Sequence, residues 1–268
     1  MKRAMLPERW ERIIELVEEQ GRASVEEIAQ TLGVSLPTVR RDLVHIQQRG
    51  MIRRLRGAAE PCEIARSVIT LADSRRMNPV EKELIGRAAA ALIAPSDCVM
   101  LDGGFTTYQV ARYLSAHDLT VVTNSLDVAQ AVAGRKDISL VVLGGLLMVE
   151  SGATVGATTE RQVMELAADK AILGANAFLP DDGLFADMQL AAEVKKAMIR
   201  SCREVIVVAD ASKLCKSALY RAASLEEVGT LVTDDRADEA VLEAIRRAGV
   251  KVIVAEGSRT GVVEGDGK

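Results

Sequence analysis

Aromatic residues are scarce in this chain. Phe, Trp and Tyr together make up 3% of its 268 residues, against 49% hydrophobic residues overall. The hydrophobic core must therefore be built from Ala, Val, Leu, Ile and Met. Cores of this kind are common where helices pack on a parallel β-sheet, whose strands are buried on both faces.

Cysteine and histidine are too few and too scattered for a structural metal site. The only candidates are Cys62, Cys98, Cys202, Cys215, His45 and His117, with no Cys-x-x-Cys pair. Structural zinc sites draw on closely spaced pairs of these residue types. We therefore expect no metal, and reduced thiols of the kind found in cytosolic proteins.

The chain also lacks a membrane segment and the known nucleotide-binding fingerprints. No stretch approaches the roughly 18 apolar residues of a membrane span, and Pro7 and Glu8 interrupt the N-terminus too early for a signal peptide. Neither Gly-x-Gly-x-x-Gly after a strand nor a P-loop motif occurs. We expect a cytoplasmic protein with no membrane partner and with no nicotinamide, ATP or other cofactor.

Basic charge is concentrated near the N-terminus of an acidic protein. The net charge is −4, yet residues 1–60 carry 11 Lys and Arg against 9 Asp and Glu. Within residues 34–57, Asp42 alone opposes six arginines: Arg40, Arg41, Arg49, Arg53, Arg54 and Arg56. A local basic block favours a surface for a polyanion. An ordinary solvated face would show the same charges, so charge alone leaves both interpretations open.

Three short helices are predicted near the N-terminus. Apolar residues recur at helical spacing in three stretches between Trp10 and Ile46, and a glycine follows each stretch. Ser24 and Glu27 have capping-box spacing at the start of the second helix. Residues 51–57 then predict a short β-ribbon. These elements together predict a winged helix-turn-helix domain over residues 1–57.

The third predicted helix has polar residues opposite its apolar stripe, which consists of Leu36, Val39, Leu43 and Ile46. Arg can pair with guanine O6 and N7, Thr can meet a thymine methyl group, and the start of a helix suits a phosphate. We predict double-stranded operator DNA as a partner. The predicted contacts are Ser35, Thr38, Arg40, Arg41, His45, Arg53, Arg54 and Arg56. A three-helix module used for protein contact is the alternative.

From about residue 80 onward, short apolar runs alternate with helical stretches. The runs begin at Cys98 and recur as far as Val254. This alternation predicts βαβ units and a mostly parallel sheet. We assign residues 58–79 to a linker, residues 80–256 to an effector-binding α/β domain and residues 257–268 to a flexible, Gly-rich tail.

Polar loops follow several of the predicted strands, at the sheet edge where parallel α/β sheets bind ligands. Glycines there let the backbone approach a ligand, and hydroxyls and amides at a helix start suit an anion. Lys213 is available to meet a phosphate. The predicted effector-binding residues are Asp102, Gly103, Gly104, Thr106, Thr107, Thr123, Asn124, Ser125, Gly144, Gly145 and Lys213.

The segment SVEEIAQTLGVSLPTVRRDLVHIQQRGMIRRLRGAA resembles the signature of the DeoR family of bacterial transcription regulators. The matching residues are Val25, Ile28, Ala29, Leu32, Val34, Ser35, Thr38 to Leu43 and Gly50. The chain departs from that signature in the ribbon, with Arg56 in place of His and Ala58 in place of the second Gly. These departures concern the geometry and sequence preference of the wing.

The later loops resemble the effector domain of the same family, through Asp102, Gly104, Thr106 and Thr107 and through Val-Thr-Asn-Ser at 122–125. The resemblance covers residues 8–254. It implies an α/β protein with an N-terminal winged helix-turn-helix domain and a Rossmann-like, ribose-5-phosphate-isomerase-like effector domain. It also implies a repressor of carbohydrate-metabolism genes, controlled by a phosphorylated sugar or related metabolite, which forms a homo-oligomer (dimer or tetramer).

The isomerase-like fold makes a sugar-phosphate isomerase-like enzyme with an appended DNA-binding domain the alternative. Such an enzyme needs a positioned carboxylate base. The loop that would carry paired acids reads Gly-Ala-Asn-Ala at 174–177, where Asn176 also departs from the family's Asp. Glu193 and Lys195 are a further acid/base candidate, but helix faces carry such pairs routinely. We therefore expect no catalysis, and a sugar end of the effector site that differs from the family pattern.

Overall fold

The computed structural model describes residues 7–48, 52–55, 57–61, 64–65, 71–214 and 216–257. Its N-terminal domain, the head, has the helices α1 (Glu8–Gln20), α2 (Val25–Leu32) and α3 (Leu36–Gln48). The strands β1 (Ala23–Ser24), β3 (Ala58–Pro61) and β2 (Ile52–Leu55) form an antiparallel sheet in that order. This is the predicted winged helix-turn-helix. Its hairpin extends to Pro61, four residues into the segment assigned to the linker.

The apolar stripes of the three helices form the core of the head. Its buried side chains include Ile13, Val17, Ile28, Val39, Leu43 and Ile46. The predicted capping box is present, since the Ser24 hydroxyl accepts from the Glu27 amide (3.1 Å) and the Glu27 carboxylate accepts from the Ser24 amide (2.7 Å). Such a cap contributes about 1 kcal/mol. Leu36, predicted in the stripe, is 37% exposed at the first residue of α3 and does not join this core.

Part of the predicted linker is attached to the second domain. Strand β4 (Ile64–Ala65) pairs in parallel with β14 (Ser217–Ala218). Helix α4 (Leu71–Arg76) lies against α6 (Phe105–Arg112). Residues 62–63 and 66–70 of this segment lie outside the described residues, and the described helix begins at Leu71.

A parallel seven-stranded sheet forms the centre of the second domain, the sensor domain, in the order β17-β16-β13-β10-β5-β6-β7. The bounds are β5 (Cys98–Leu101), β6 (Leu119–Thr123), β7 (Ile138–Val142), β10 (Ala168–Gly174), β13 (Cys202–Val208), β16 (Thr230–Asp234) and β17 (Lys251–Ala255). The chain starts at β5, moves outward to β7, then crosses to β10 on the other side of β5. This Rossmann-like order confirms the predicted fold and places a topological switch point between β5 and β10.

Helices cover both faces of this sheet because its strands alternate apolar residues between the faces. Val99 and Leu101 face a cluster formed with α5 (Pro79–Ala90), α6 and α7 (Leu126–Val132). Met100 faces the opposite cluster, formed with α8 (Ala157–Met164), α9 (Gln189–Arg200) and α10 (Glu239–Arg247). The sheet is therefore the middle of three layers, as the aliphatic composition predicts.

Small antiparallel elements that the sequence did not predict complete the sensor domain. A hairpin is formed by β8 (Leu146–Met148) and β9 (Ala153–Val155), and a small sheet by β11 (Ala177–Leu179), β12 (Gly183–Ala186) and β15 (Tyr220–Ala223). The 3₁₀ helices η1 (Ala211–Lys213) and η2 (Leu225–Glu227) lie on either side of β15 in the chain. Strands of three or four residues are too short to show a clear alternation.

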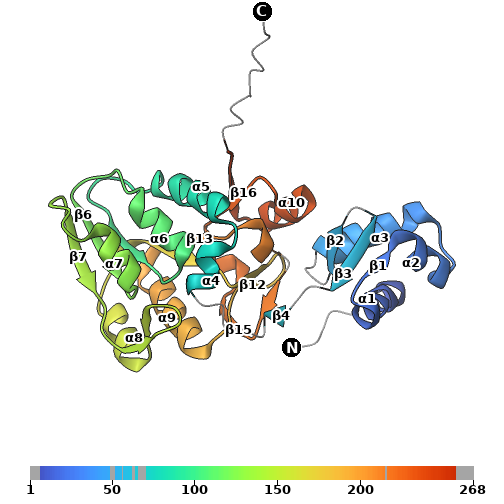
Figure 1. Cartoon of the computed structure of the whole chain (residues 1–268), viewed down its shortest axis with the longest axis horizontal. Helices are drawn as coiled ribbons and strands as arrows, with labels where there is room; N and C mark the ends of the chain where they lie inside the picture. Colours follow the sequence, from blue (N-terminus) through green and yellow to red (C-terminus); the bar gives the residue numbers. More distant parts are fainter. Residues whose placement is uncertain are drawn as a thin grey trace, which may run out of the picture.

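The head lies at one end of the molecule, beside α10 of the sensor domain (Figure 1). Helix α3 contacts α10 there. Within the described ranges, no helix combines the length and the hydropathy needed to span a bilayer. Of the predicted tail, residues 258–268 lie outside the described part of the chain.

Candidate ligand site and DNA-binding face

A pocket of about 140 Å³ lies at the switch point of the parallel sheet. Its floor is formed where β5 and β10 end, at Asp102 and Gly174. The chain leaves these neighbouring strands toward opposite sides of the sheet, which opens a crevice between their carboxyl ends. Gly103, Gly104 and Thr106 line the same pocket, at the N-terminus of α6. The sheet topology thus places the predicted loop where α/β proteins bind ligands.

Two glycines let the backbone pass close to this pocket. Gly104 has φ = 136°, a conformation that residues with a side chain rarely adopt. A Cβ atom on Gly103 would lie 2.8 Å from the Cβ of Ala153, which is too close for two carbon atoms. Both glycines are therefore required by the geometry of the loop between β5 and α6.

A buried ion pair ties the two sides of the switch point together. Lys195 of α9 contacts Asp102 at the end of β5 through its ammonium group and also donates to the carbonyl oxygen of Gly174 (2.9 Å). Asp102 in turn accepts from the Gly174 amide (3.3 Å). Both charged side chains are almost fully buried. Asp102, predicted as an acceptor for a ligand hydroxyl, thus neutralises Lys195 and fixes the pocket floor.

Two further lysines bring positive charge to the pocket. Lys82 of α5 is 2% exposed and donates to the carbonyl oxygen (2.7 Å) and hydroxyl (3.2 Å) of Ser74. Burial, with the nearby Lys213 charge, lowers the pKa of Lys82 to about 8. Burial also lowers the pKa of Lys213, on η1. Within the described chain neither lysine forms an ion pair with a carboxylate, so the pocket offers two incompletely neutralised cations to an anion.

The pocket also has a polar side, formed by residues that carry hydrogen-bonding groups. Asn176 donates to the Asp187 carboxylate (2.6 Å), and burial raises the pKa of Asp187 despite the neighbouring Lys213 and Lys195. Asn124 donates to the Thr154 carbonyl oxygen (2.8 Å), and its own side-chain oxygen is buried without a hydrogen-bond partner among the described residues. These groups suit the hydroxyls of a small polar ligand.

Six of the predicted effector residues line this pocket: Asp102, Gly103, Gly104, Thr106, Asn124 and Lys213. The other five do not. The Thr107 hydroxyl donates to the Gly104 carbonyl oxygen (2.8 Å), and the Thr123 hydroxyl donates to that of Leu101 (2.6 Å). The Ser125 hydroxyl caps α7 by accepting from the Val128 amide. These three hydroxyls therefore satisfy backbone groups.

Gly144 and Gly145, also predicted as effector residues, form a structural turn after β7. The Gly144 amide donates to Gln162 (2.9 Å), and its carbonyl oxygen accepts from the Thr159 hydroxyl (2.8 Å). A Cβ atom on Gly145 would collide with that hydroxyl. The close approach of α8 explains these glycines and leaves them outside the pocket.

Several of the predicted DNA-binding residues lie on the exposed side of α3. Arg40, Arg41 and His45 are exposed, while Val39, Leu43 and Ile46 are buried. Ser35 caps the helix as predicted, accepting from the Thr38 amide (3.4 Å), and its hydroxyl also bonds that of Thr38 (2.8 Å). The ring of His45 stacks on Trp10 at 5.5 Å between centroids. Arg54 lies on β2 of the wing, whereas Arg56 and the side chain of Arg53 lie outside the described structure.

A buried carboxylate that sequence reasoning did not assign fixes α3 to α1. Asp42 accepts from the Arg9 guanidinium (2.6 and 2.9 Å) and from the Trp10 indole (2.9 Å). Burial alone would raise the pKa of Asp42, but the hydrogen bonds from Arg9 and Trp10 hold it below its usual value. The single acid among the predicted arginines is therefore a structural anchor of the recognition helix.

The acid/base pair considered for catalysis does not form. Glu193 pairs with Lys196 (2.7 Å), whereas Lys195 is buried against Asp102. The polar pocket residues that sequence reasoning missed include Ser74, Lys82 and Asp187, along with Lys195 in its role as a partner of Asp102. They come from α4, α5, the end of the β11–β12 hairpin and α9, far apart in sequence.

Comparison with known families assigns both domains. Residues 9–65 match the family model described as a DeoR-like helix-turn-helix domain, and residues 77–235 match that of the DeoR C terminal sensor domain. The head and the parallel-sheet domain thus correspond to the two modules of one regulator architecture.

Similar proteins share this architecture along their whole length. The chain is 32% identical to the HTH-type transcriptional repressor GlcR of Bacillus subtilis, covering 93% of this chain and 96% of that protein. It is also 32% identical to the glycerol-3-phosphate regulon repressor of Haemophilus influenzae, covering 93% and 97%. A solved ribose 5-phosphate isomerase A from Methanocaldococcus jannaschii is 18% identical with a TM-score of 0.38, covering 51% of this chain and 55% of that one. The family models and full-length relatives together show that the chain belongs to the DeoR family of DNA-binding transcriptional regulators.

Proposed function

We propose that this protein represses carbohydrate-metabolism genes and that a phosphorylated sugar, bound in the switch-point pocket, controls its binding to an operator. The observation that carries the proposal is the pair of buried lysines, Lys82 and Lys213, at the pocket beside the N-terminus of α6. Burying a cation is costly unless a counter-charge meets it. A phosphate group supplies that counter-charge, and the amides at the start of α6 favour the same anion.

The sugar part of such a ligand would meet the polar side of the pocket. Asn124, Asn176 and Asp187 present amide and carboxylate groups there. Asn176 stands where the family pattern has Asp. It therefore offers the sugar a neutral amide in place of a charged carboxylate. Relatives named for a glycerol-3-phosphate regulon support a small phosphorylated effector.

Operator binding would use the exposed face of α3 and the wing. Arg41 and Thr38 would enter the major groove, with Arg40, His45 and Ser35 at its edges and Arg53, Arg54 and Arg56 near the backbone. The exposure of Arg40 and Arg41 supports this, because within the described residues neither is engaged in an ion pair. Such a protein acts on the chromosome, which places it in the cytoplasm.

We also propose that the protein is a homo-oligomer, a dimer or tetramer, that reads a pseudo-palindromic operator. An apolar edge of the sensor domain supports self-association. Its exposed hydrophobic side chains are Val141, Val142, Leu146, Leu147 and Val149. They lie on the edge strand β7 and on or beside β8, where an unpaired strand and apolar side chains would be covered by a second copy.

Catalysis is not part of the proposal. Asp102 is neutralised by Lys195, which supports a structural role over proton transfer, whereas Asp187 accepts from Asn176 through one oxygen and has no hydrogen-bond partner for the other among the described residues. We expect no isomerisation of ribose 5-phosphate. Measurable turnover that disappears in Asp187→Asn would instead establish the enzyme alternative.

A ligand screen tests the proposed function directly. Thermal unfolding would be followed with glycerol 3-phosphate, glucose 6-phosphate, ribose 5-phosphate and inorganic phosphate, with the unphosphorylated sugars as matched controls. We expect at least one phosphorylated compound to raise the unfolding temperature and to change the affinity for DNA upstream of the protein's own gene. Stabilisation by unphosphorylated sugars alone would contradict the phosphate site.

A further inference from the structure

One short loop of the sensor domain faces both the ligand pocket and the head. Lys213 of η1 lines the pocket, while its neighbours Ala211, Ser212 and Leu214 line a second cavity of about 290 Å³. The opposite wall of that cavity belongs to the head and consists of Gln47 at the end of α3 with Arg54 and Leu55 of β2. The loop at residues 210–214 is thus a shared wall between ligand site and recognition helix.

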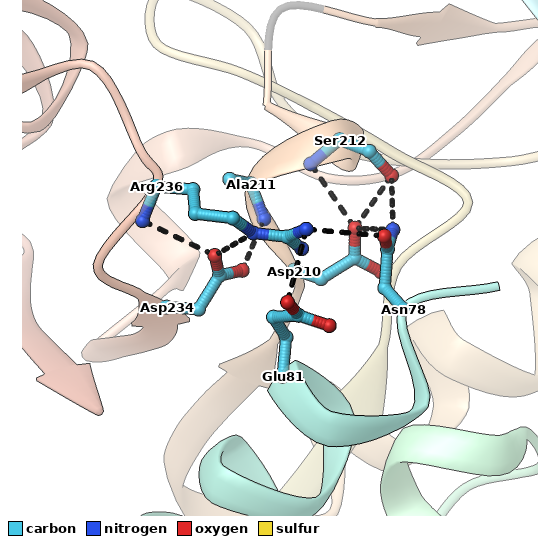
Figure 2. Close-up of polar contacts among 7 residues, drawn as sticks. All are labelled: Asn78, Glu81, Asp210, Ala211, Ser212, Asp234 and Arg236. Atoms are coloured by element: carbon cyan, nitrogen blue, oxygen red, sulfur yellow. Dashed lines mark hydrogen bonds and ion pairs between the residues drawn. The ribbon is translucent and has the colours of Figure 1, made fainter. Parts of the chain in front are cut away.

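A network of hydrogen bonds and ion pairs connects this loop to neighbouring polar side chains (Figure 2). We call it the coupling cluster and define it as Asn78, Glu81, Asp210, Ser212, Asp234 and Arg236. Asp210 accepts from the Asn78 side chain (2.9 Å) and from the Ser212 amide (3.0 Å), while Asp234 accepts from the Ala211 amide (2.7 Å). These bonds fix the position of η1.

Arg236 connects the two carboxylate anchors with helix α5. Its guanidinium donates to Asp234 (2.8 Å) and Asn78 (3.3 Å) and forms an ion pair with Glu81 (3.0 Å). Glu81 precedes Lys82, whose ammonium group is in the ligand pocket. Arg236 also lines the cavity next to the head. It therefore links the end of β16 directly to the start of α5, and reaches Asp210 through Asn78.

Asp210 relates the coupling cluster to the charge of the ligand pocket. One of its carboxylate oxygens is buried with no hydrogen-bond partner in the described chain. Its charge acts on both pocket lysines, Lys82 and Lys213, for which it is a counter-ion at longer range. An anion bound by these lysines would take over that role and leave the buried Asp210 charge less compensated. The free energy of the loop that Asp210 anchors would change as a result.

We propose that the coupling cluster transmits occupancy of the ligand pocket to the DNA-binding head by shifting the loop that both share. The inference rests on the proposed function for the identity of the anion. A ligand controls DNA binding only if it favours one arrangement of the head over another. Because the loop and the head line the same cavity, a shift of the loop would change the packing of α3 and the wing against the sensor domain, and this would supply that preference.

A double-mutant cycle tests the coupling without knowledge of the ligand. Lys213→Met removes the pocket charge that an anion would neutralise, and Arg236→Gln loosens the coupling cluster at a half-exposed position. Hydrogen exchange of the full chain would be measured at residues 36–48 and 52–55. We expect Lys213→Met to change exchange there by about fivefold or more, the lower end of typical allosteric effects. The same change introduced into Arg236→Gln should have little effect on the head.

Three controls separate coupling from general damage. Ser212→Ala is a milder variant and should show a partial loss of coupling, and Arg203→Gln, which removes an exposed arginine paired with Asp169, should show none. Titrating glycerol 3-phosphate and inorganic phosphate onto Arg236→Gln should give wild-type affinities, while their effect on DNA binding is lost. An undiminished Lys213→Met effect in the Arg236→Gln background, or no effect in either background, would overturn the proposal. Failure of both phosphates to bind wild-type protein would count against the proposed function alone.

Discussion

The head and the sensor domain use positive charge in opposite ways. The head displays Arg40 and Arg41 on the surface of α3, where water solvates them until a polyanion arrives. The sensor domain buries Lys82 and Lys213 in a small pocket. DNA is large and highly charged, so exposed cations bind it well through counterion release. A single phosphate offers far less charge, and desolvated lysines strengthen each contact with it.

The difference implies different costs in the two domains. Solvated arginines cost the head little stability, whereas a buried lysine with a lowered pKa destabilises the folded sensor domain as long as it stays charged. The sensor domain should therefore gain stability from its ligand, and the head should gain little from losing an arginine. This contrast sets the expected sign of each variant below.

The largest effect is expected for Lys82→Met. Loss of a buried, charge-assisted hydrogen bond of about 1.5–3 kcal/mol should weaken binding of a phosphorylated sugar by about 10- to 150-fold. Isothermal titration calorimetry would measure the affinity, and Lys136→Met, at an exposed lysine, is the matched control.

The same variant should be more stable than wild type when no ligand is present. The folded pKa of Lys82 is about 8, below the ordinary value of 10.5, so the charge opposes folding below about pH 8. The penalty disappears as the pH rises from about 8 to 10.5. The unfolding temperature of Lys82→Met should exceed that of wild type at pH 7 and converge with it near pH 10. If the two unfolding temperatures differ by the same amount at pH 7 and near pH 10, the charge of Lys82 does not destabilise the folded protein.

A comparable effect on stability is expected in the head for Asp42→Ala. The variant leaves the hydrogen-bond donors of Arg9 and Trp10 without their acceptor. Because Arg9 is half-exposed, we expect a loss of about 1–3 kcal/mol rather than the full cost of a broken buried pair. Fluorescence of Trp10, the only tryptophan, would report unfolding of the head. Retained ligand binding would confirm that the sensor domain is intact.

The pKa of Asp42 gives this prediction a pH dependence. Its folded pKa is lowered, so its contribution is present above the unfolded value of about 3.9 and is lost as the pH falls through the folded pKa. Wild-type head should lose stability in acid below about pH 4, and Asp42→Ala should lose less. If wild type and Asp42→Ala lose the same stability in acid, Asp42 does not anchor α3.

Charged residues on buried stripes are the feature that sequence reasoning overlooked in both domains. The stripe of α3 has the spacing 39, 42, 43 and 46, in which Asp42 occupies an apolar position. Lys82 likewise falls in the stripe of α5, with Ile85, Gly86 and Ala89. Charged side chains are seldom fully buried unless they are paired, and neither residue was assigned a buried role from the sequence. A charge at a stripe position is the signal that would have identified both.

Other parts of the site were predictable because their geometry is local. Ser35 caps the helix that carries Arg41, and Gly103 and Gly104 follow one strand, so period and loop position determine where they lie. The pairing of Lys195 with Asp102, or of Asn176 with Asp187, depends instead on how α9 and the β11–β12 hairpin fold over the sheet. Spacing along the chain carries no information on such contacts. The parallel sheet was predicted for the same local reason, and its short antiparallel additions were not.

Arg41→Ala tests the role of an exposed arginine of the head in operator binding. Loss of an arginine from a base-reading position should cost about 1–3 kcal/mol of operator affinity and relax the preference at one base pair. Binding to a set of operator variants by fluorescence anisotropy would measure both. Arg12→Ala, an exposed arginine on α1, is the control. A uniform loss over all sequences would instead assign Arg41 to the phosphate backbone.

The smallest effect is expected when the pH is changed, which should alter ligand binding by the sensor domain more than DNA binding by the head. Above the pKa of about 8, Lys82 loses its proton, so affinity for a phosphorylated sugar should fall by about tenfold between pH 7 and pH 9. Below about pH 6 the phosphate group itself becomes protonated, and the affinity should fall again.

Calorimetry in buffers of different ionisation enthalpy should show proton uptake on binding near pH 8, because the anion raises the pKa of Lys82. Operator affinity of ligand-free Lys82→Met should stay nearly constant from pH 7 to pH 9, since this variant lacks the titrating lysine and the arginines of the head keep their charge throughout. Proton uptake that persists in Lys82→Met would assign the titration to Lys213, and the absence of any uptake would show that the phosphate does not bind at these lysines.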